Sequence, residues 1–171
     1  SGKSGSAWLI EQNHGLKLPR ALQQDFSQHV QQETDRHGKE MTQNALWQLF
    51  RTRYGLVATP HYALQSYRSD GQQDGQLRLT ASVVTQGGTR QLEGHGNGLL
   101  SAAAHGLSRW VNAPFVIKDY HEHTLGERSD SRSVAYIRCL FQDGSSRWGV
   151  GIDSDVARAS LQALFNAVSR S

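Results

Sequence analysis

Hydrophobic positions in the first third of the chain repeat at helical spacing. Leu22, Phe26 and Val30 follow one another at steps of four and form one stripe of a predicted helix. A second helix is predicted over 42–54, with a threonine at its first position as N-cap. Two helices of this size bury little surface alone, so residues 1–55 are expected to form a connector subdomain that packs on another part of the chain.

From residue 56 the pattern changes to the alternation that is typical of strands. Every second residue from Leu77 to Val83 is apolar, which gives a strand one buried face. Three strands are predicted, over residues 61–69, 76–85 and 89–93. The spacing of apolar residues then changes to that of an amphipathic helix running from Leu100 to Val111.

The same order of elements then returns. Strands are predicted over 115–124, 133–141 and 147–152, with turns over 126–130 and 143–144. A last helix carries Leu161, Leu164, Phe165 and Val168 at positions i, i+3, i+4 and i+7.

An internal repeat of about 55 residues predicts an α+β fold. Two pseudo-symmetric β-β-β-α units would then share one core over residues 56–171, preceded by a small helical linker subdomain over residues 1–55. Each unit alone is too small to bury the apolar face of its sheet. Such a domain is expected to pair again as a symmetric dimer.

Composition narrows the classes of function. The 171 residues include 18 Lys and Arg against 15 Asp and Glu, and both signs are spread along the chain, so no nucleic-acid partner is predicted. No apolar run approaches the ~18 residues of a membrane span. The single cysteine, Cys139, excludes an internal disulfide framework and suits the cytoplasm. The chain begins without Met and is expected to be part of a longer protein.

The glycine-rich segment 94–98 is the first candidate for chemistry. Its alternate glycines allow the backbone to approach a ligand closely, and the helix that follows offers unpaired N–H groups to an anion. A carboxylate or a phosphate would suit such a site. The alternative is a tight turn from strand to helix.

The second candidate is the sequence Asp-Tyr-His-Glu-His at 119–123. On a strand, Asp119, His121 and His123 share one face, and two imidazoles with a carboxylate form a possible zinc or iron site. The alternative is that these residues are exposed polar side chains on a sheet face and bind no metal. The opposite face carries Tyr120, Glu122 and Thr124. No Gly-x-Ser-x-Gly nucleophile motif occurs, and no catalytic residue is predicted.

Taken together, several motifs in one order resemble the C-terminal part of the 2-isopropylmalate synthase family. The motifs are Glu-Gly-His-Gly-Asn-Gly at 93–98, Asp-Tyr-His-Glu-His at 119–123, Trp-Gly-Val-Gly-Ile at 148–152, Ala-Ser-Leu at 159–161 and Ala-Val-Ser-Arg at 167–170. Leu-Lys-Leu-Pro-Arg at 16–20 resembles the family's connector. The resemblance covers essentially the whole chain and extends to the related citramalate synthases.

The resemblance implies a helical linker followed by a leucine-binding regulatory domain that forms a homodimer. Family members condense acetyl-CoA with 3-methyl-2-oxobutanoate, the first committed step of leucine biosynthesis. That reaction takes place in a catalytic barrel that holds a divalent metal. This chain is therefore expected to hold no cofactor, metal or catalytic residue of its own, and to act on the catalytic domain of its parent.

The resemblance also implies an effector pocket at the start of the first amphipathic helix. Opposite this helix start lie residues of the fourth and fifth strands and of the start of the last helix. The residues carried over are Gly96, Asn97, Gly98, Leu100, Ser101, Ile117, Tyr120, Thr124, Ser131, Ser133 and Val156.

The sequence departs from the family's pattern at Leu99, where a small residue is common, and at Ser101, Thr124 and Ser131, where alanine is common, so the predicted pocket is smaller or more polar. Three alternatives follow. The domain could sense isoleucine, as in citramalate synthase, or serve only for dimerisation after losing its effector. A small metalloenzyme that uses Asp119, His121 and His123 is the third.

Overall fold

The computed structural model describes residues 3–126 and 131–169. Its elements, in chain order, are α1 (Lys3–His14), α2 (Arg20–His37), α3 (Gln43–Tyr54), β1 (Ala63–Gly71), β2 (Leu77–Thr85), β3 (Gly88–Gly96), α4 (Leu99–Trp110), β4 (Phe115–Leu125), β5 (Arg132–Phe141), β6 (Ser146–Asp153) and α5 (Val156–Val168). This order confirms the α+β prediction of two β-β-β-α units after a helical segment. Most of the predicted turn over 126–130 lies outside the described residues, as does Arg170 of the last motif.

The N-terminal segment contains three helices, whereas the sequence pattern predicts two. The additional helix, α1, buries only Ala7 and Ile10 among its apolar residues, too few to produce a clear stripe. The predicted start of α3 is confirmed, because the Thr42 side chain accepts a hydrogen bond from the Ala45 N–H at 3.1 Å.

The three N-terminal helices pack on each other and on the second sheet. Phe26, Phe50 and Tyr54 are fully buried and meet edge to face or tilted. Tyr136 of β5 and Trp148 of β6 belong to the same hydrophobic cluster. The helices therefore share a core with the rest of the chain, as their size leads one to expect.

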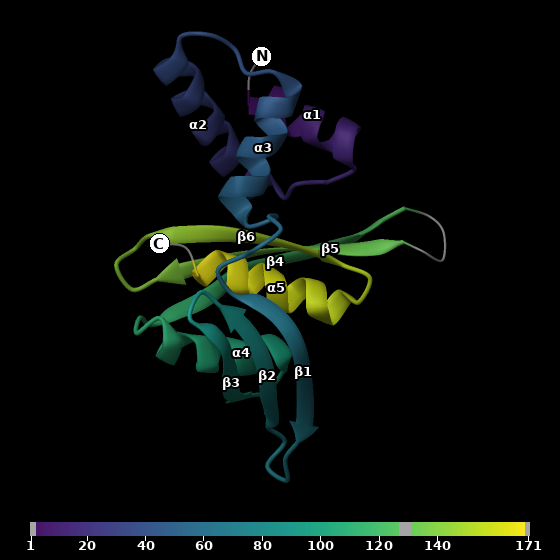
Figure 1. The fold of residues 1–171 in the computed structure, drawn as a ribbon, viewed down its shortest axis with the longest axis vertical. Coiled ribbons are helices and arrows are strands. Elements are labelled where there is room, and N and C mark those ends of the chain that lie inside the picture. Colours follow the sequence, from purple (N-terminus) through teal and green to yellow (C-terminus); the bar gives the residue numbers. More distant parts are fainter. Residues whose placement is uncertain (1–2, 127–130, 170–171) are drawn as a thin grey trace.

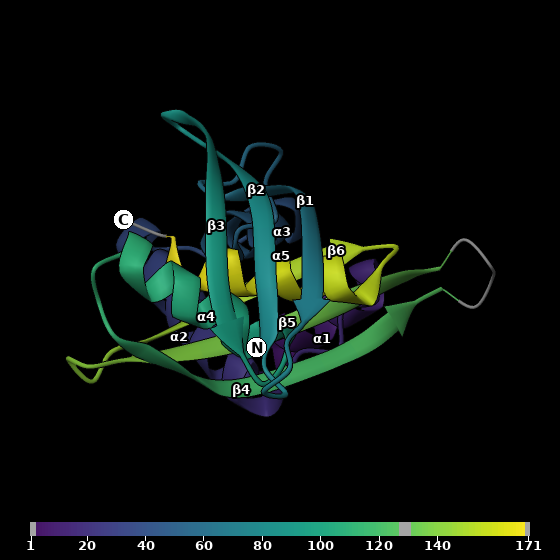
Figure 2. The same ribbon diagram turned by 90° about the horizontal axis from the view of Figure 1, so that it is seen from below.

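The six strands form two separate antiparallel sheets in the orders β1-β2-β3 and β4-β5-β6. Four layers result: the N-terminal helices, the second sheet, the helices α4 and α5, and the first sheet (Figure 1). Seen from below, the strands of the first sheet cross those of the second with α5 between them (Figure 2). Each unit carries an irregularity in its first strand, after Leu64 in β1 and after Ile117 in β4.

Paired glycines bring each helix onto the last strand of its unit. A Cβ atom at Gly94 would lie 1.9 Å from the Ala102 carbonyl oxygen of α4, and one at Gly149 would lie 2.2 Å from the Ala163 carbonyl oxygen of α5. Gly96 and Gly151 are equally crowded. The segment 94–98, predicted as a loop, therefore belongs to β3 as far as Gly96, and its first two glycines approach a helix rather than a ligand.

The last helix fills the centre of the domain. All four residues of its predicted apolar stripe are buried, and so are five further residues between Ala159 and Ala167. A helix buried on nearly all sides needs a covering layer on each face, which the two sheets supply. Among the residues that the structure describes, no helix has the length and apolar character needed to cross a membrane.

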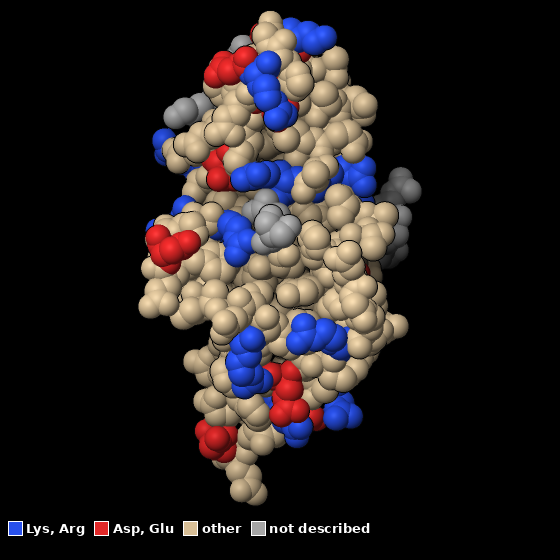
Figure 3. All heavy atoms as spheres, turned by 60° about the vertical axis from the view of Figure 1, so that its left-hand side comes forward, with Lys and Arg blue, Asp and Glu red and all other residues tan. Residues whose placement is uncertain are grey.

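Charged side chains of both signs are distributed over the surface. On the face shown in Figure 3, basic and acidic groups are interspersed from the N-terminal helices down to the first sheet. Two exposed pairs illustrate this mixing: Arg36 with Glu33 at 2.6 Å, and Arg78 with Glu93 at 2.9 Å. The surface thus has the mixed charge that the even spread along the sequence predicts.

Candidate functional site

A cavity of about 440 Å³ lies where the starts of α4 and α5 meet β4. Its lining combines a helix start, a carboxylate, hydroxyl groups and apolar side chains. The lining residues are Asn97, Gly98, Leu99, Leu100, Ser101, Tyr120, Glu122, Val156, Ala157 and Ser160. Such a combination of apolar surface and a few polar groups is typical of small-molecule sites.

The two helix starts at this cavity are built differently. Gly98, the N-cap of α4, is extended at φ −166° and makes no side-chain hydrogen bond to the helix. Asp155, the N-cap of α5, accepts a hydrogen bond from the Ala157 N–H at 3.0 Å. The first turn of α4 therefore keeps N–H groups available to an anion, and the positive end of the helix dipole lies behind them.

Polar side chains around the α4 start hold its backbone in place. The Ser101 hydroxyl accepts a hydrogen bond from the Gly98 N–H at 3.2 Å and donates to the Asn97 side-chain oxygen at 2.9 Å. These bonds fix residues 97–101 into one turn. The Ser101 hydroxyl is thus occupied within the turn and does not by itself make the cavity polar.

Tyr120 and Glu122 form the polar wall on the strand side. The Tyr120 hydroxyl donates to the Glu122 carboxylate and lies 2.8 Å from the Ser160 hydroxyl oxygen on α5. Partial burial, together with the hydrogen bond to Glu122, raises the pKa of Tyr120 above its usual range. The phenol therefore stays neutral, and Glu122 is the negative group of the cavity.

The apolar part of the lining comes from both helices. Leu99 and Leu100 begin α4, and Val156 begins α5 with 43% of its surface exposed. An apolar residue exposed at a helix start beside a cavity offers contact area to a small aliphatic group. The site can therefore receive a carboxylate, an ammonium group and an aliphatic side chain at once.

The structure brings six of the eleven predicted site residues together in this cavity. They are Asn97, Gly98, Leu100, Ser101, Tyr120 and Val156. Thr124 and Ser133 lie opposite each other in the second sheet, further along the face that carries Tyr120. Ser131 directly precedes β5, beyond that pair.

The remaining two predicted residues are partly buried and lie outside the cavity lining. Gly96 lies against Ser101 and Ala102, where a Cβ atom would have no room. Ile117 packs against the core formed by both units. Both residues position the cavity from behind.

Four lining residues are absent from the sequence prediction: Leu99, Glu122, Ala157 and Ser160. Two of them carry a periodic signal. Glu122 lies two residues after Tyr120 on a strand, and Ser160 lies four residues after Val156 on a helix. Extending each predicted residue by one period would have found both.

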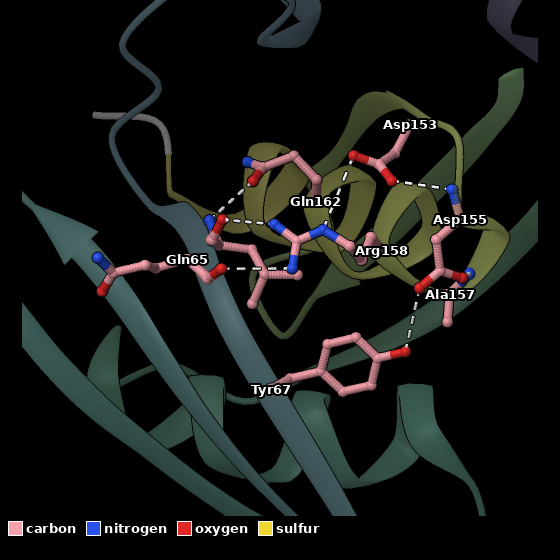
Figure 4. Close-up of polar contacts among 8 residues, drawn as sticks. Gln65, Tyr67, Asp153, Asp155, Ala157, Arg158 and Gln162 are labelled. Atoms are coloured by element: carbon pink, nitrogen blue, oxygen red, sulfur yellow. Dashed lines mark hydrogen bonds and ion pairs between the residues drawn. The ribbon is translucent and has the colours of Figure 1, made fainter.

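The start of α5 is tied to the first sheet by polar contacts (Figure 4). Arg158 donates hydrogen bonds to the carbonyl oxygens of Leu64 and Gln65 at 3.1 and 3.3 Å, and its guanidinium lies 3.7 Å from Asp153. The Tyr67 hydroxyl donates to Asp155 at 3.3 Å. These contacts hold β1 of the first unit against the helix that forms one wall of the cavity.

The three suggested metal ligands lie on the opposite face of β4 from this cavity; Asp119 and His123 bond to other groups, and His121 is exposed. Asp119 pairs with Arg138, the Arg138 Nε lying 2.5 Å from the carboxylate, and His123 contacts Tyr136 and the backbone of Lys17. Within residues 3–126 and 131–169, no group of three or more His, Cys, Asp or Glu could hold a metal ion. These contacts give Asp119 and His123 a role in packing strand β4 against its neighbours.

Comparison with known proteins gives a consistent picture. A sequence model described as the LeuA allosteric (dimerisation) domain matches residues 40–171. The chain is 44% identical over 169 residues to 2-isopropylmalate synthase of Marinomonas sp. (strain MWYL1), covering 98% of this chain and 30% of that protein. It is 42% identical to the protein of that name from Pseudomonas syringae pv. tomato and 37% identical to the one from Thermobifida fusca, over 100% and 99% of this chain and 30% and 29% of those proteins. The chain thus spans about 30% of the length of these relatives.

Proposed function

Since the chain belongs to the LeuA allosteric (dimerisation) domain family of 2-isopropylmalate synthase, we propose that it binds leucine as a feedback effector in the cavity between α4, α5 and β4. The parent would be the cytoplasmic enzyme that condenses acetyl-CoA with 3-methyl-2-oxobutanoate. The observation that carries the proposal is the uncapped start of α4 facing the Glu122 carboxylate across an apolar cavity.

Each part of leucine has a partner of suitable chemistry in this cavity. Its carboxylate is bound by the first N–H groups of α4, where the helix dipole favours an anion. Its ammonium group is bound by Glu122, whose carboxylate already accepts from Tyr120. Its isobutyl group packs among Leu100 and Val156.

The departures from the family pattern do not argue against binding. The Ser101 hydroxyl is occupied by Asn97 and Gly98, and Thr124 and Ser131 lie outside the cavity lining. Isoleucine has the same polar ends and differs by the position of one methyl group, which changes binding by only about 1–3 kcal/mol in an apolar pocket. The ligand preference is therefore a direct outcome of the titration below.

The remaining parts of the proposal concern organisation. Residues 1–55 act as the linker subdomain that joins the regulatory domain, residues 56–171, to the parent's catalytic domain. The regulatory domain forms a homodimer, which the description of the matching family as a dimerisation domain supports. Sedimentation equilibrium should give twice the mass of 19.0 kDa, and a mass of one chain at all accessible concentrations would contradict the dimer.

Calorimetric titration tests the effector site. The chain should bind leucine more tightly than isoleucine or valine. Glu122→Gln removes the charge that holds the ammonium group, and Gly98→Asp places a negative side chain at the carboxylate site, so each should weaken leucine binding by about tenfold or more. Glu93→Gln changes a carboxylate outside the cavity and serves as the matched control. Equal affinity for leucine in the unchanged chain and in all three variants would contradict the assigned site.

A further inference from the structure

Strand β4 contacts two different parts of the molecule with its two faces. Tyr120 and Glu122 face the cavity, and Thr124 continues the same face. The alternate residues Asp119 and His123 face the opposite side, towards the N-terminal helices. One strand thus separates the proposed effector site from the linker by the thickness of a single layer.

His123 forms a direct contact between β4 and the segment that joins α1 to α2. Its Nε2 accepts a hydrogen bond from the Lys17 N–H at 3.1 Å and lies 2.7 Å from the hydroxyl oxygen of Tyr136. Because Nε2 accepts from an amide, the ring proton is on Nδ1, which lies 3.3 Å from the Thr124 carbonyl oxygen. Tyr136 is fully buried in the hydrophobic cluster of the N-terminal helices.

A second contact lies two residues further along β4. Leu125 packs against the cluster of the N-terminal helices. A Cβ atom built at Gly15 would lie only 3.2 Å from the Leu125 Cδ2 atom. Gly15 also has φ +74°, a backbone conformation that favours glycine. The end of β4 therefore touches the α1–α2 connection at two points, Gly15 and Lys17.

The start of the same face is also tied to the linker. Asp119 bonds to Arg138 of β5, and the Arg138 guanidinium lies 5.3 Å from the centre of the Trp148 ring. Trp148 belongs to the cluster that contains Phe50 and Tyr54 of α3. Asp119 is therefore connected to the N-terminal helices through Arg138 and Trp148, whereas His123 contacts their connecting segment directly.

We propose that β4 transmits effector binding to the linker, with His123 as the positioning residue that holds the α1–α2 connection. This inference rests on the proposed function, because it takes leucine as the ligand on the Tyr120 and Glu122 face. Leucine that orders β4 from that face stabilises the bond between His123 and Lys17 on the other face. Thermodynamic reciprocity then requires that loss of this bond weaken leucine binding by the same factor.

Amide hydrogen exchange of the full 171-residue chain measures this bond directly, because the Lys17 N–H is its donor. Saturating leucine should slow exchange at Lys17 by about fivefold or more. His123→Phe keeps a ring beside Tyr136 but removes the acceptor. In this variant the Lys17 N–H should exchange rapidly with and without leucine. Its affinity for leucine should also be lower than that of the unchanged chain. The expected ratio of affinities equals the factor by which leucine slows exchange at Lys17 in the unchanged chain.

Two further variants separate the bond from a general structural effect. His123→Gln retains an acceptor at a similar reach and should restore most of the leucine effect at Lys17. His121→Phe alters an exposed residue of the same face and should behave as the unchanged chain. Leucine that binds but leaves Lys17 exchange unaltered overturns the inference alone. Absence of any binding heat overturns the proposed function and the inference with it.

Discussion

The two units of the domain share a topology but are packed in different environments. In each, a glycine pair brings the helix onto the third strand, and a polar helix residue bonds to the strand backbone between the two glycines. His105 accepts from the His95 N–H at 3.1 Å in the first unit, whereas Asn166 donates to the Val150 carbonyl oxygen at 2.7 Å in the second. The first contact is exposed and the second is buried.

This difference follows from the layers around each sheet. The second sheet is covered by α5 on one face and by the N-terminal helices on the other, while the first sheet packs only its inner face against the helices. The same pattern of contacts therefore stabilises a buried central unit in one copy and a more exposed unit in the other. Matched substitutions in the two units measure how far the surroundings decide the cost.

The largest effect is expected from filling the glycine contact of the second unit. Gly149→Ala places a Cβ atom 2.2 Å from the Ala163 carbonyl oxygen, and β6 cannot retreat because Trp148 and Val150 pack on the N-terminal helices. We expect a loss of about 3 kcal/mol or more in the free energy of unfolding. Urea denaturation followed by circular dichroism measures it.

The matching change in the first unit is Gly94→Ala. Its contact is closer still, at 1.9 Å, but the outer face of β3 is open to solvent and the strand can shift outward, so we expect a smaller loss of about 1–2 kcal/mol. Gly71→Ala, which meets nothing within 4 Å, is the neutral control. Equal losses for Gly94→Ala and Gly149→Ala would show that the surrounding layers do not matter.

The next effect is expected at the buried polar residue of α5. Asn166 donates to the Val150 and Gly55 carbonyl oxygens and accepts from Gln162. Asn166→Ala leaves these groups buried without their partner, which should cost about 2–3 kcal/mol. His105→Ala, the exposed counterpart, should cost about 0.5 kcal/mol or less. Thermal unfolding of the two variants gives the comparison, and the reverse order would contradict it.

A smaller effect is expected at the helix starts. Asp155→Ala removes the cap of α5 and should cost about 1 kcal/mol. Gly98→Asp supplies a side chain to the uncapped start of α4 and should change stability by only a few tenths of a kcal/mol, although it should weaken leucine binding. Chemical denaturation measures the free energy of unfolding of both variants and distinguishes the two effects. A large stability change from Gly98→Asp would mean that the α4 start is structural.

The smallest effect is expected at the exposed ion pair of the first sheet. Hydrogen bonding and charge from Arg78 hold the pKa of Glu93 below its usual range. A carboxylate with a lowered folded pKa stabilises the fold above its unfolded pKa, and this contribution is lost as pH falls below about 4. Glu93→Gln should thus reduce stability slightly at pH 7, with the difference vanishing at low pH and at high salt. A difference that grows on acidification would reverse the assignment.

The sequence predicted most of the fold because alternation and helical spacing are both pronounced after residue 56. The same pattern, two glycines separated by one residue, predicts a strand in the second unit and a turn or ligand-binding segment in the first. Val150 and Ile152 beside the second pair indicate a strand, whereas His95 and Asn97 beside the first pair resemble a loop. Both turns and close helix contacts require glycine, so only the structure distinguishes them.

The predicted site residues at the helix starts line one cavity, whereas those on the strands do so only in part. Six of the predicted residues share the cavity because a resemblance in sequence carries over local turns well. Thr124 and Ser133 depend on how far the cavity extends along a sheet face, and that extent is set by where α4 and α5 cross the sheet. Such distances between elements leave no periodic signal in the chain.

The central position of α5 has a consequence for synthesis on the ribosome. Residues of both sheets pack on this helix, yet it follows every strand in the chain. Until α5 has emerged, the parts of both sheets that pack on this helix stay uncovered, although α4 can already cover part of the first sheet. We therefore expect the core of the domain to be completed only after α5 has been synthesised.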